Sequence, residues 1–385
     1  MKKIKFLTAG ESHGEMLLGI LEGIPSNLKI GESYINFHLQ RRQMGFGRGK
    51  RMQIENDKPH IYSGVRFGET LGSPIGIMIK NNDWINWKNK MSIEDKKRKI
   101  NKVTIPRPGH ADLAGIQKYD FDDIRNVIER SSARETAIRV ALGSICRKLL
   151  EEFNIHIGSY VSSIYTIKDL KNYNDMEPQK MNLKADKSAV RSLGDNSIED
   201  KMIKEISIAK QKGDSIGGSF QIHVSGVPYG LGSYISWDEK LNAQLGKAIL
   251  SINGIKSFNV GLGEDSENRL GSQLHDEIDY KNNQYKRLSN NCGGIEGGMS
   301  NGQKIILSAT MKPIPTLIKP LKSIDIQTKK KTLAHKERTD SCSVPAASII
   351  GESMVAMVIC DALLDKFGGD SMQQLSNHIK QSAKY

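Results

Sequence analysis

Cysteine is scarce in this chain, with only four in 385 residues. Cys146, Cys292, Cys342 and Cys360 show no close paired spacing and have no set of histidines beside them. The pattern therefore predicts no metal site and no disulfide framework. It favours a protein of the reducing cytoplasm.

Long apolar runs are also missing. Polar residues arrive by Thr8, so the N-terminus has no apolar stretch typical of a signal peptide. The longest apolar run, residues 344–364, is interrupted by Ser348, Glu352, Ser353 and Asp361. It therefore predicts a buried helix and not a membrane span.

Negative charge is in deficit, because 56 Lys and Arg stand against 43 Asp and Glu, a formal charge of +13. Such a balance favours anionic partners, and a basic nucleic-acid-binding protein is one alternative. However, the lysines are scattered, aromatic residues make up only 6% of the chain, and no nucleic-acid-binding module is recognisable. Binding nucleic acid needs a basic face with aromatics that stack on bases, so we expect neither nucleic acid nor membrane as a partner.

No internal repeat and no linker rich in proline or serine divides the chain. We therefore expect residues 1–385 to form a single domain. The most polar stretch, about residues 168–213, predicts an excursion with exposed helices, because Ile203, Ile206 and Ile208 give only a partial apolar stripe.

Two helices and two strands can be placed from periodicity. Apolar residues recur at helical spacing from Ala137 to Leu149, and a second helix runs from near Pro345 to Gly368, apolar on nearly every face and hence central. Alternation predicts strands at residues 75–79 and 220–224. Helices and strands mix without a regular strand-helix-strand rhythm, which favours an α+β fold with antiparallel sheets.

Four segments crowd small residues around ionisable ones, at residues 10–14, 107–112, 130–135 and 338–342. Together they hold histidines, carboxylates and arginines, which predicts an enzyme acting on an anion. No nucleotide-binding phosphate loop is present, and this argues against a kinase.

The segment 130–135 also opens the first helix. Ser132 and Glu135 have the spacing of a capping box, so the helix N-terminus lies near Ser131 to Arg134. Unpaired backbone N–H groups there, with Arg130 and Arg134, suit a bound phosphate. The alternative is an ordinary capped surface helix.

Taken together, these segments resemble the chorismate synthase family over almost the whole chain. The matching motifs follow the family's order at residues 8–14, 22–25, 41–43, 107–112, 131–136, 253–254, 312–316 and 338–340. One departure is Thr339, where family members usually carry serine, histidine or phenylalanine.

The resemblance implies a fold with helices sandwiched between antiparallel sheets, and a homotetramer. It implies a 1,4-anti elimination of phosphate from 5-enolpyruvylshikimate 3-phosphate, giving chorismate and requiring reduced FMN without net redox change. No appended reductase domain is evident, so we expect an external flavin reductase, while NADPH stays open as a direct reductant.

The resemblance also assigns roles to residues. His13 would protonate the leaving phosphate, His110 would face the reduced flavin, and Asp340, relayed by Ser12, would accept a proton from the flavin's central-ring nitrogen. The arginines matching substrate-clamping positions are Arg42, Arg48, Arg107, Arg134 and Arg338. The residues matching FMN-binding positions are Arg130, Ser131, Ser132, Asn253, Gly254, Gly298, Lys312, Pro313, Ile314, Pro315, Thr316 and Arg338.

Overall fold

The computed structural model describes residues 1–48, 57–94, 100–337 and 339–382. Its largest elements are two antiparallel sheets. The first has the order β1 (Lys5–Ala9), β2 (Met16–Glu22), β6 (Ile75–Lys80) and β3 (Pro59–Ile61). The second has the order β10 (Ile255–Val260), β15 (Ile305–Met311), β9 (Gly218–Ser225), β7 (His156–Ile164) and β8 (Ile167–Lys168).

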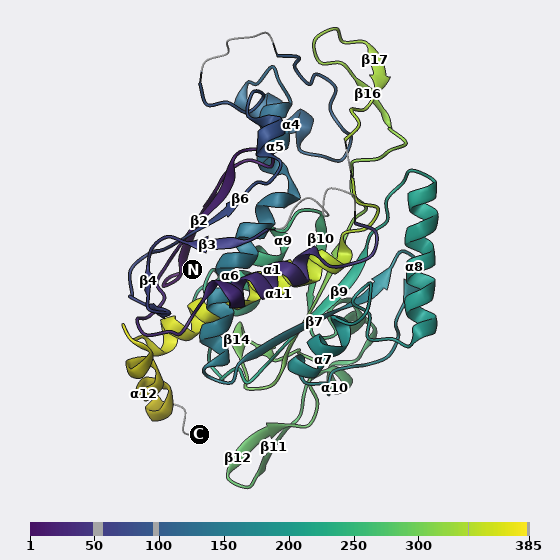
Figure 1. Ribbon diagram of the computed structural model, residues 1–385. Helices are drawn as coiled ribbons and strands as arrows, with labels where there is room; N and C mark the ends of the chain where they lie inside the picture. Colours follow the sequence, from purple (N-terminus) through teal and green to yellow (C-terminus); the bar gives the residue numbers. More distant parts are fainter. Residues whose placement is uncertain (49–56, 95–99, 338, 383–385) are drawn as a thin grey trace.

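Three helices lie between these sheets (Figure 1): α1 (Glu32–Gln43), α6 (Thr136–Glu151) and α11 (Val344–Phe367). Helix α6 packs on β2 and β6, whereas α11 packs on β7 and β9 and also on α6. The two helices approach closely, since a Cβ at Gly143 of α6 would lie 2.6 Å from the Ser353 carbonyl oxygen of α11. The predicted α+β sandwich is confirmed.

Helix α11 is the central helix that the apolar run predicts. Pro345 stands in its first turn, and Gly368 ends it with a φ of 65°. Among the described residues it is the one helix long and apolar enough to cross a membrane, and its apolar window is entirely buried inside the protein. Both predicted strands are also present, as β6 and β9, with their alternating apolar residues buried.

The polar stretch at 168–213 contains α7 (Pro178–Ala185) and α8 (Asn196–Gln211). Helix α8 lies at one side of the molecule (Figure 1). The segment is nevertheless anchored inside, because Met181, Ala185, Met202 and Ile206 are fully buried. The excursion therefore contributes to the core.

The remaining elements surround this sandwich. Helices α4 (Asp112–Tyr119) and α5 (Arg125–Ser131) lie at one end, near the hairpin of β16 (Lys322–Ile324) and β17 (Lys331–Leu333) (Figure 1). The others are β4 (Val65–Arg66), β5 (Glu69–Thr70), α3 (Trp84–Trp87), η1 (Ala133–Glu135), α9 (Leu241–Leu250), η2 (Gly263–Asn268), α10 (Gly271–Leu274), β11 (Ile278–Lys281), β12 (Gln284–Arg287), β13 (Ile295–Glu296), β14 (Met299–Ser300) and α12 (Met372–Ser382).

A buried ion cluster fastens the helix layer to the second sheet. The Glu352 carboxylate accepts from Arg41 Nη1 at 2.7 Å, from Arg147 Nη1 at 2.5 Å and from Ser159 Oγ at 2.6 Å. Arg191 Nη2 lies 3.3 Å from the same carboxylate. Burial alone would raise the pKa of Glu352, but the three guanidinium groups outweigh it and hold that pKa well below its usual value.

We expect Glu352→Gln to lower the free energy of unfolding by about 3–5 kcal/mol at pH 7, because it leaves buried guanidinium charge uncompensated. Since the folded pKa is depressed, this contribution is present above the ordinary glutamate pKa and is lost as pH falls through the folded value. Urea unfolding at pH 7 and at pH 3 measures both effects. A difference between variant and wild type that does not shrink at pH 3 would contradict this account of the cluster.

Candidate active site

His13 lies in the loop that joins β1 to β2. Gly10 begins the turn with a φ of 102°, and a Cβ there would lie 2.3 Å from the Met16 carbonyl oxygen, so only glycine fits. The Ser12 amide donates to the carbonyl oxygen of Glu129 at 2.9 Å, which docks the loop on α5. Both Ser12 and His13 are buried.

The imidazole of His13 is held by a carboxylate and a ring. Its Nδ1 lies 2.9 Å from Glu129 Oε1, while its backbone amide donates to Glu129 Oε2 at 2.7 Å. The ring stacks on Trp87 of α3, with centroids 3.7 Å apart. Burial alone would raise the pKa of Glu129, but hydrogen bonds from His13 outweigh it and lower that pKa.

His110 forms a second imidazole–carboxylate pair at the start of α4. Its Nδ1 lies 2.5 Å from Oδ1 of the fully buried Asp112. Arg107 Nε donates to Asp112 Oδ2 at 2.9 Å, and Arg107 Nη1 donates to Thr316 Oγ1 at 2.9 Å. Burial opposes ionisation of Asp112, yet His110 and Arg107 hold its pKa well below the usual range. Hydrogen bonds thus hold the Arg107, His110 and Asp112 side chains in one fixed arrangement.

Arg42 and Arg134 bring two further cations to the start of α6. Arg42 donates to Thr136 Oγ1 at 2.9 Å and to the Ala133 carbonyl oxygen at 3.0 Å. Arg134 Nη2 lies 3.1 Å from Oδ1 of Asp57, and Arg42 Nη1 lies 3.8 Å from Oδ2 of the same residue. These guanidinium groups are buried, so they would interact with an anion largely shielded from water.

Asp340 meets one of the predicted clamping arginines. Arg48 Nη1 lies 3.0 Å from Asp340 Oδ2, and Ser343 Oγ donates to the same oxygen at 3.0 Å. Asp340 and Thr339 precede α11, as predicted. Arg338 lies outside the described residues.

The segment 130–135 differs in detail from the predicted capping box. Ser132 Oγ accepts from the Arg134 amide at 3.3 Å, but it caps the 3-10 turn η1, and α6 starts only at Thr136. The Glu135 carboxylate binds Thr8 Oγ1 at 2.8 Å and Arg139 Nε at 2.8 Å instead of returning to the cap. A partner on β1 therefore replaces the local bond. Arg130 likewise donates to Thr8.

Most of the predicted FMN-binding residues lie together. Asn253 Nδ2 donates to the Ser131 carbonyl oxygen at 3.0 Å, and the Lys312 amide donates to the Gly254 carbonyl oxygen at 2.9 Å. Lys312 Nζ then donates to the Gly109 carbonyl oxygen at 2.6 Å, next to His110. Residues 312–316 thus lie between the C-terminal end of α5 and the segment that holds His110. Thr316 completes this connection, because its hydroxyl accepts a hydrogen bond from Arg107.

Gly298 is not brought into this group. Its carbonyl oxygen accepts from the amide of Leu241, the first residue of α9, whereas Asn253 follows the end of that helix. A helix of this length separates the two by about 15 Å. Gly298 lies at the other end of α9 from the remaining predicted FMN-binding residues.

Several residues of the site were not predicted from the sequence. Glu129, Asp57, Trp87 and Glu337 carry no motif of their own, and only the fold brings them to His13, Arg134 and Arg107. Asp112 stood inside a recognised segment, and its two-residue spacing from His110 could have indicated the pair.

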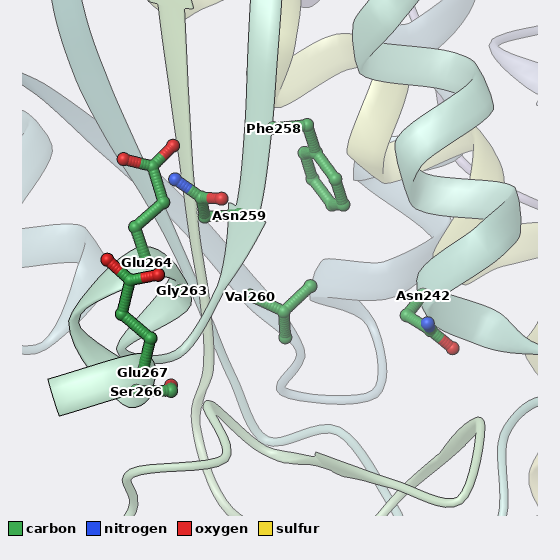
Figure 2. Close-up of a pocket in the computed structure, with 8 residues that line it drawn as sticks. All are labelled: Asn242, Phe258, Asn259, Val260, Gly263, Glu264, Ser266 and Glu267. Carbon is green, nitrogen blue, oxygen red and sulfur yellow. The ribbon is translucent and has the colours of Figure 1, made fainter. Parts of the chain in front are cut away.

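A cavity of about 630 Å³ lies elsewhere, between the start of α9, strand β10 and η2. Figure 2 shows Glu264 and Glu267 together on one side of it and Asn242 on the other. Two carboxylates make this cavity unsuited to an anionic ligand, and none of the predicted site residues lines it.

Ligand atoms of Asp276, Cys292 and Glu296 lie within 4.8 Å of one another, the one such group of possible metal ligands among the described residues. Asp276 already accepts from two backbone amides and Ser289, and Glu296 pairs with Arg287. Burial and Asp276 raise the pKa of the Cys292 thiol to about 12, and a protonated thiol is a poor metal ligand. All four cysteines are free.

The chain is similar to known proteins along its whole length. The family model described as chorismate synthase matches residues 4–364. The chain is 53% identical over 372 residues to the chorismate synthase of Alkaliphilus metalliredigens, covering 96% of this chain and 97% of that protein. It is 49% identical to the chorismate synthase of Aquifex aeolicus, covering 99% of both chains. A crystal structure titled chorismate synthase superposes with a TM-score of 0.80 at 39% identity, covering 100% of this chain and 98% of that one. This chain therefore belongs to the chorismate synthase family.

Proposed function

We propose that the residues around His13, His110, Arg134 and Asp340 form the active site for the family's reaction. The chain is a carbon–oxygen lyase that eliminates phosphate from 5-enolpyruvylshikimate 3-phosphate to give chorismate, the last step of the shikimate pathway. Membership of this family argues against the alternative of a basic nucleic-acid-binding protein. The roles of individual residues are our proposal.

One observation carries this proposal: ion pairs through Arg125, Glu337 and Arg107 connect two imidazole–carboxylate pairs, His13–Glu129 and His110–Asp112. Phosphate leaves poorly as a highly charged anion, and His13 is placed to donate a proton to it. With Nδ1 against Glu129, Nε2 is the nitrogen that would meet a substrate oxygen. The guanidinium groups of Arg42, Arg48, Arg107, Arg134 and Arg338 would bind the phosphate and carboxylates and stabilise charge that spreads during elimination.

The chemistry of the donors suits FMN, whose reduced form the family requires. Hydroxyl groups of Ser131, Ser132 and Thr316, the Asn253 amide, and cations of Lys312 and Arg130 match a ribityl chain and a phosphate. At Gly254, with a φ of 83°, a Cβ would lie 3.1 Å from Met311 Cε, so a larger residue would crowd this wall. When bound, the reduced flavin supplies electron density for breaking the carbon–oxygen bond.

In this arrangement His110 would hold a positive charge toward the flavin, with Asp112 fixing its ring. Asp340, with Ser12 as a relay, would accept the proton removed from the substrate ring. Asp340 contacts Arg48, which holds its carboxylate in place. Gly298 would reach the same FMN only from the other end of α9.

We further propose an external flavin reductase as the source of reduced FMN, with direct reduction by NADPH as the alternative. The protein is expected to act in the cytoplasm. Anaerobic assays that compare pre-reduced FMN with oxidised FMN plus NADPH separate the two sources. Chorismate formation at equal rates in both assays would show that the chain reduces its own flavin.

We also propose a homotetramer. The outer face of the first sheet exposes Leu7, Leu18 and Ile20 side by side on β1 and β2, and an apolar face of this kind is typical of a subunit contact. Light scattering of the purified protein would measure the assembly. A monomer at micromolar concentration would refute this proposal.

We expect Arg134→Ala to weaken substrate binding by about 2–5 kcal/mol, because it removes a buried cation from the anion-binding group. Calorimetric titration with the phosphorylated substrate measures this loss. Since the change also leaves Asp57 without one partner, the double variant Arg134→Ala with Asp57→Asn separates binding from folding. Arg66→Ala, at an exposed arginine, is the control. Unchanged affinity in the Arg134 variant would remove this residue from the substrate site.

A further inference from the structure

Glu129 stands directly behind His13 and makes three of its contacts. Its carboxylate lies 2.9 Å and 3.1 Å from His13 Nδ1 and accepts the His13 amide at 2.7 Å. The carboxylate is 1% exposed. A buried anion in this position fixes the orientation of the ring. It also keeps a proton on Nδ1.

Behind Glu129, charged side chains of alternating sign continue across the site. Arg125 Nη1 lies 3.3 Å from Glu129 Oε1 and 2.8 Å from Glu337 Oε1. Glu337 Oε2 in turn lies 3.7 Å from Arg107 Nη1. Arg107 pairs with Asp112, and Asp112 holds His110. An unbroken chain of ion pairs thus joins the two histidines.

We propose that Glu129 is a positioning residue that keeps His13 in its protonated form, and that Arg125 and Glu337 extend this control toward His110. The proposal rests on the proposed function, in which His13 is the proton donor. It explains why a carboxylate is buried here. It also gives a purpose to Glu337, which bridges two arginines from separate segments.

Glu129 and His13 influence each other's charge. Hydrogen bonds from His13 lower the pKa of Glu129, and on our proposal the ionised carboxylate in turn favours the protonated imidazole. Arg125 opposes this effect as a cation, while Glu337 compensates Arg125. The His13 ring also stacks on Trp87. The indole N–H of Trp87 donates to Asp83, and Lys90 Nζ lies over the Trp87 ring. Glu11 and Glu15 are the remaining charged groups in the loop itself.

The test is an NMR titration of ¹⁵N-histidine-labelled full-length protein, with the His13 signal assigned from a His13→Asn variant. In Glu129→Gln the pH at which His13 loses its proton should fall by about 1–2 pH units, since an adjacent opposite charge is lost. Glu129→Asp, which keeps the charge, should restore most of the shift. Glu152→Gln, at an exposed glutamate paired with Lys148, should change nothing.

The same change should appear in turnover. A protonated acid is lost as pH rises, so the high-pH limb of the kcat profile should move to lower pH in Glu129→Gln. A purely structural role would lower stability without moving this limb. If Glu129→Gln does not fold, Glu337→Gln should give a smaller fall of the His13 midpoint in the same direction.

An unchanged His13 midpoint in Glu129→Gln, or in Glu337→Gln where only that variant folds, would overturn the proposal. The titration needs no turnover, so it is independent of the proposed function. Failure of the function would show as a wild-type protein that forms no chorismate. Failure of this inference would show as an active wild type and an unmoved midpoint.

Discussion

Replacing His13 with alanine is expected to lower kcat about 100- to 10,000-fold while leaving substrate affinity nearly intact. General acid catalysis is typically worth that much, because proton donation to the leaving phosphate matters mainly as the bond breaks. In the structure the imidazole is buried, held by Glu129 and stacked on Trp87.

Anaerobic turnover at saturating substrate with pre-reduced FMN measures this effect. The matched control is His60→Ala, because His60 is half-exposed on β3 and makes only a weak contact with Glu32. Circular dichroism checks that the His13→Ala variant is still folded. Near-normal kcat in the folded variant would remove His13 from the role of acid.

Asp340→Asn is expected to slow chorismate formation severely while FMN and substrate still bind. Asparagine keeps the size and most hydrogen bonds of the carboxylate, including the contact with Ser343 Oγ, but it cannot accept a proton as a base. Supplying reduced FMN removes the reductant step from the comparison. The expected loss is about 100-fold or more, the usual contribution of a general base.

The alternative is that Asp340 merely organises the start of α11. Ser343, the N-cap residue of α11, makes no capping hydrogen bond with its side chain and donates to Asp340 instead, while Asp340 also contacts Arg48. Asp365→Asn, at the exposed end of the same helix, is the matched control. Wild-type turnover by Asp340→Asn would make Asp340 structural and would end the proposed proton route through Ser12.

Hydrophobic periodicity was sufficient to predict the helices and strands that bury either one face or every face. Helix α11 is apolar on nearly every face, and α1, α6 and the second sheet cover it. The apolar run in the sequence predicts this burial directly. The strands β6 and β9 are predicted by alternation. The 3-10 turn η1 was not predicted, because the bond that displaces the capping box comes from Thr8, over a hundred residues away.

The site divides in the same way. His13, His110, Arg134 and Asp340 lie in motifs rich in glycine and charge, and they could be named from the sequence. Their partners could not, since Glu129, Asp57 and Glu337 reach the site only through the packing of α5 and the segments before β3 and α11. Gly298 could also be named from its motif position. The motif could not predict that Gly298 lies at the start of α9, away from the other predicted FMN-binding residues.

The most direct test of the account is the stoichiometry of a single anaerobic turnover with pre-reduced FMN. The account predicts that one chorismate and one phosphate form for each substrate consumed, and that the flavin spectrum at the end is still that of reduced FMN. Chorismate formed with oxidised FMN and no reductant, or reduced flavin consumed in proportion to product, would contradict it.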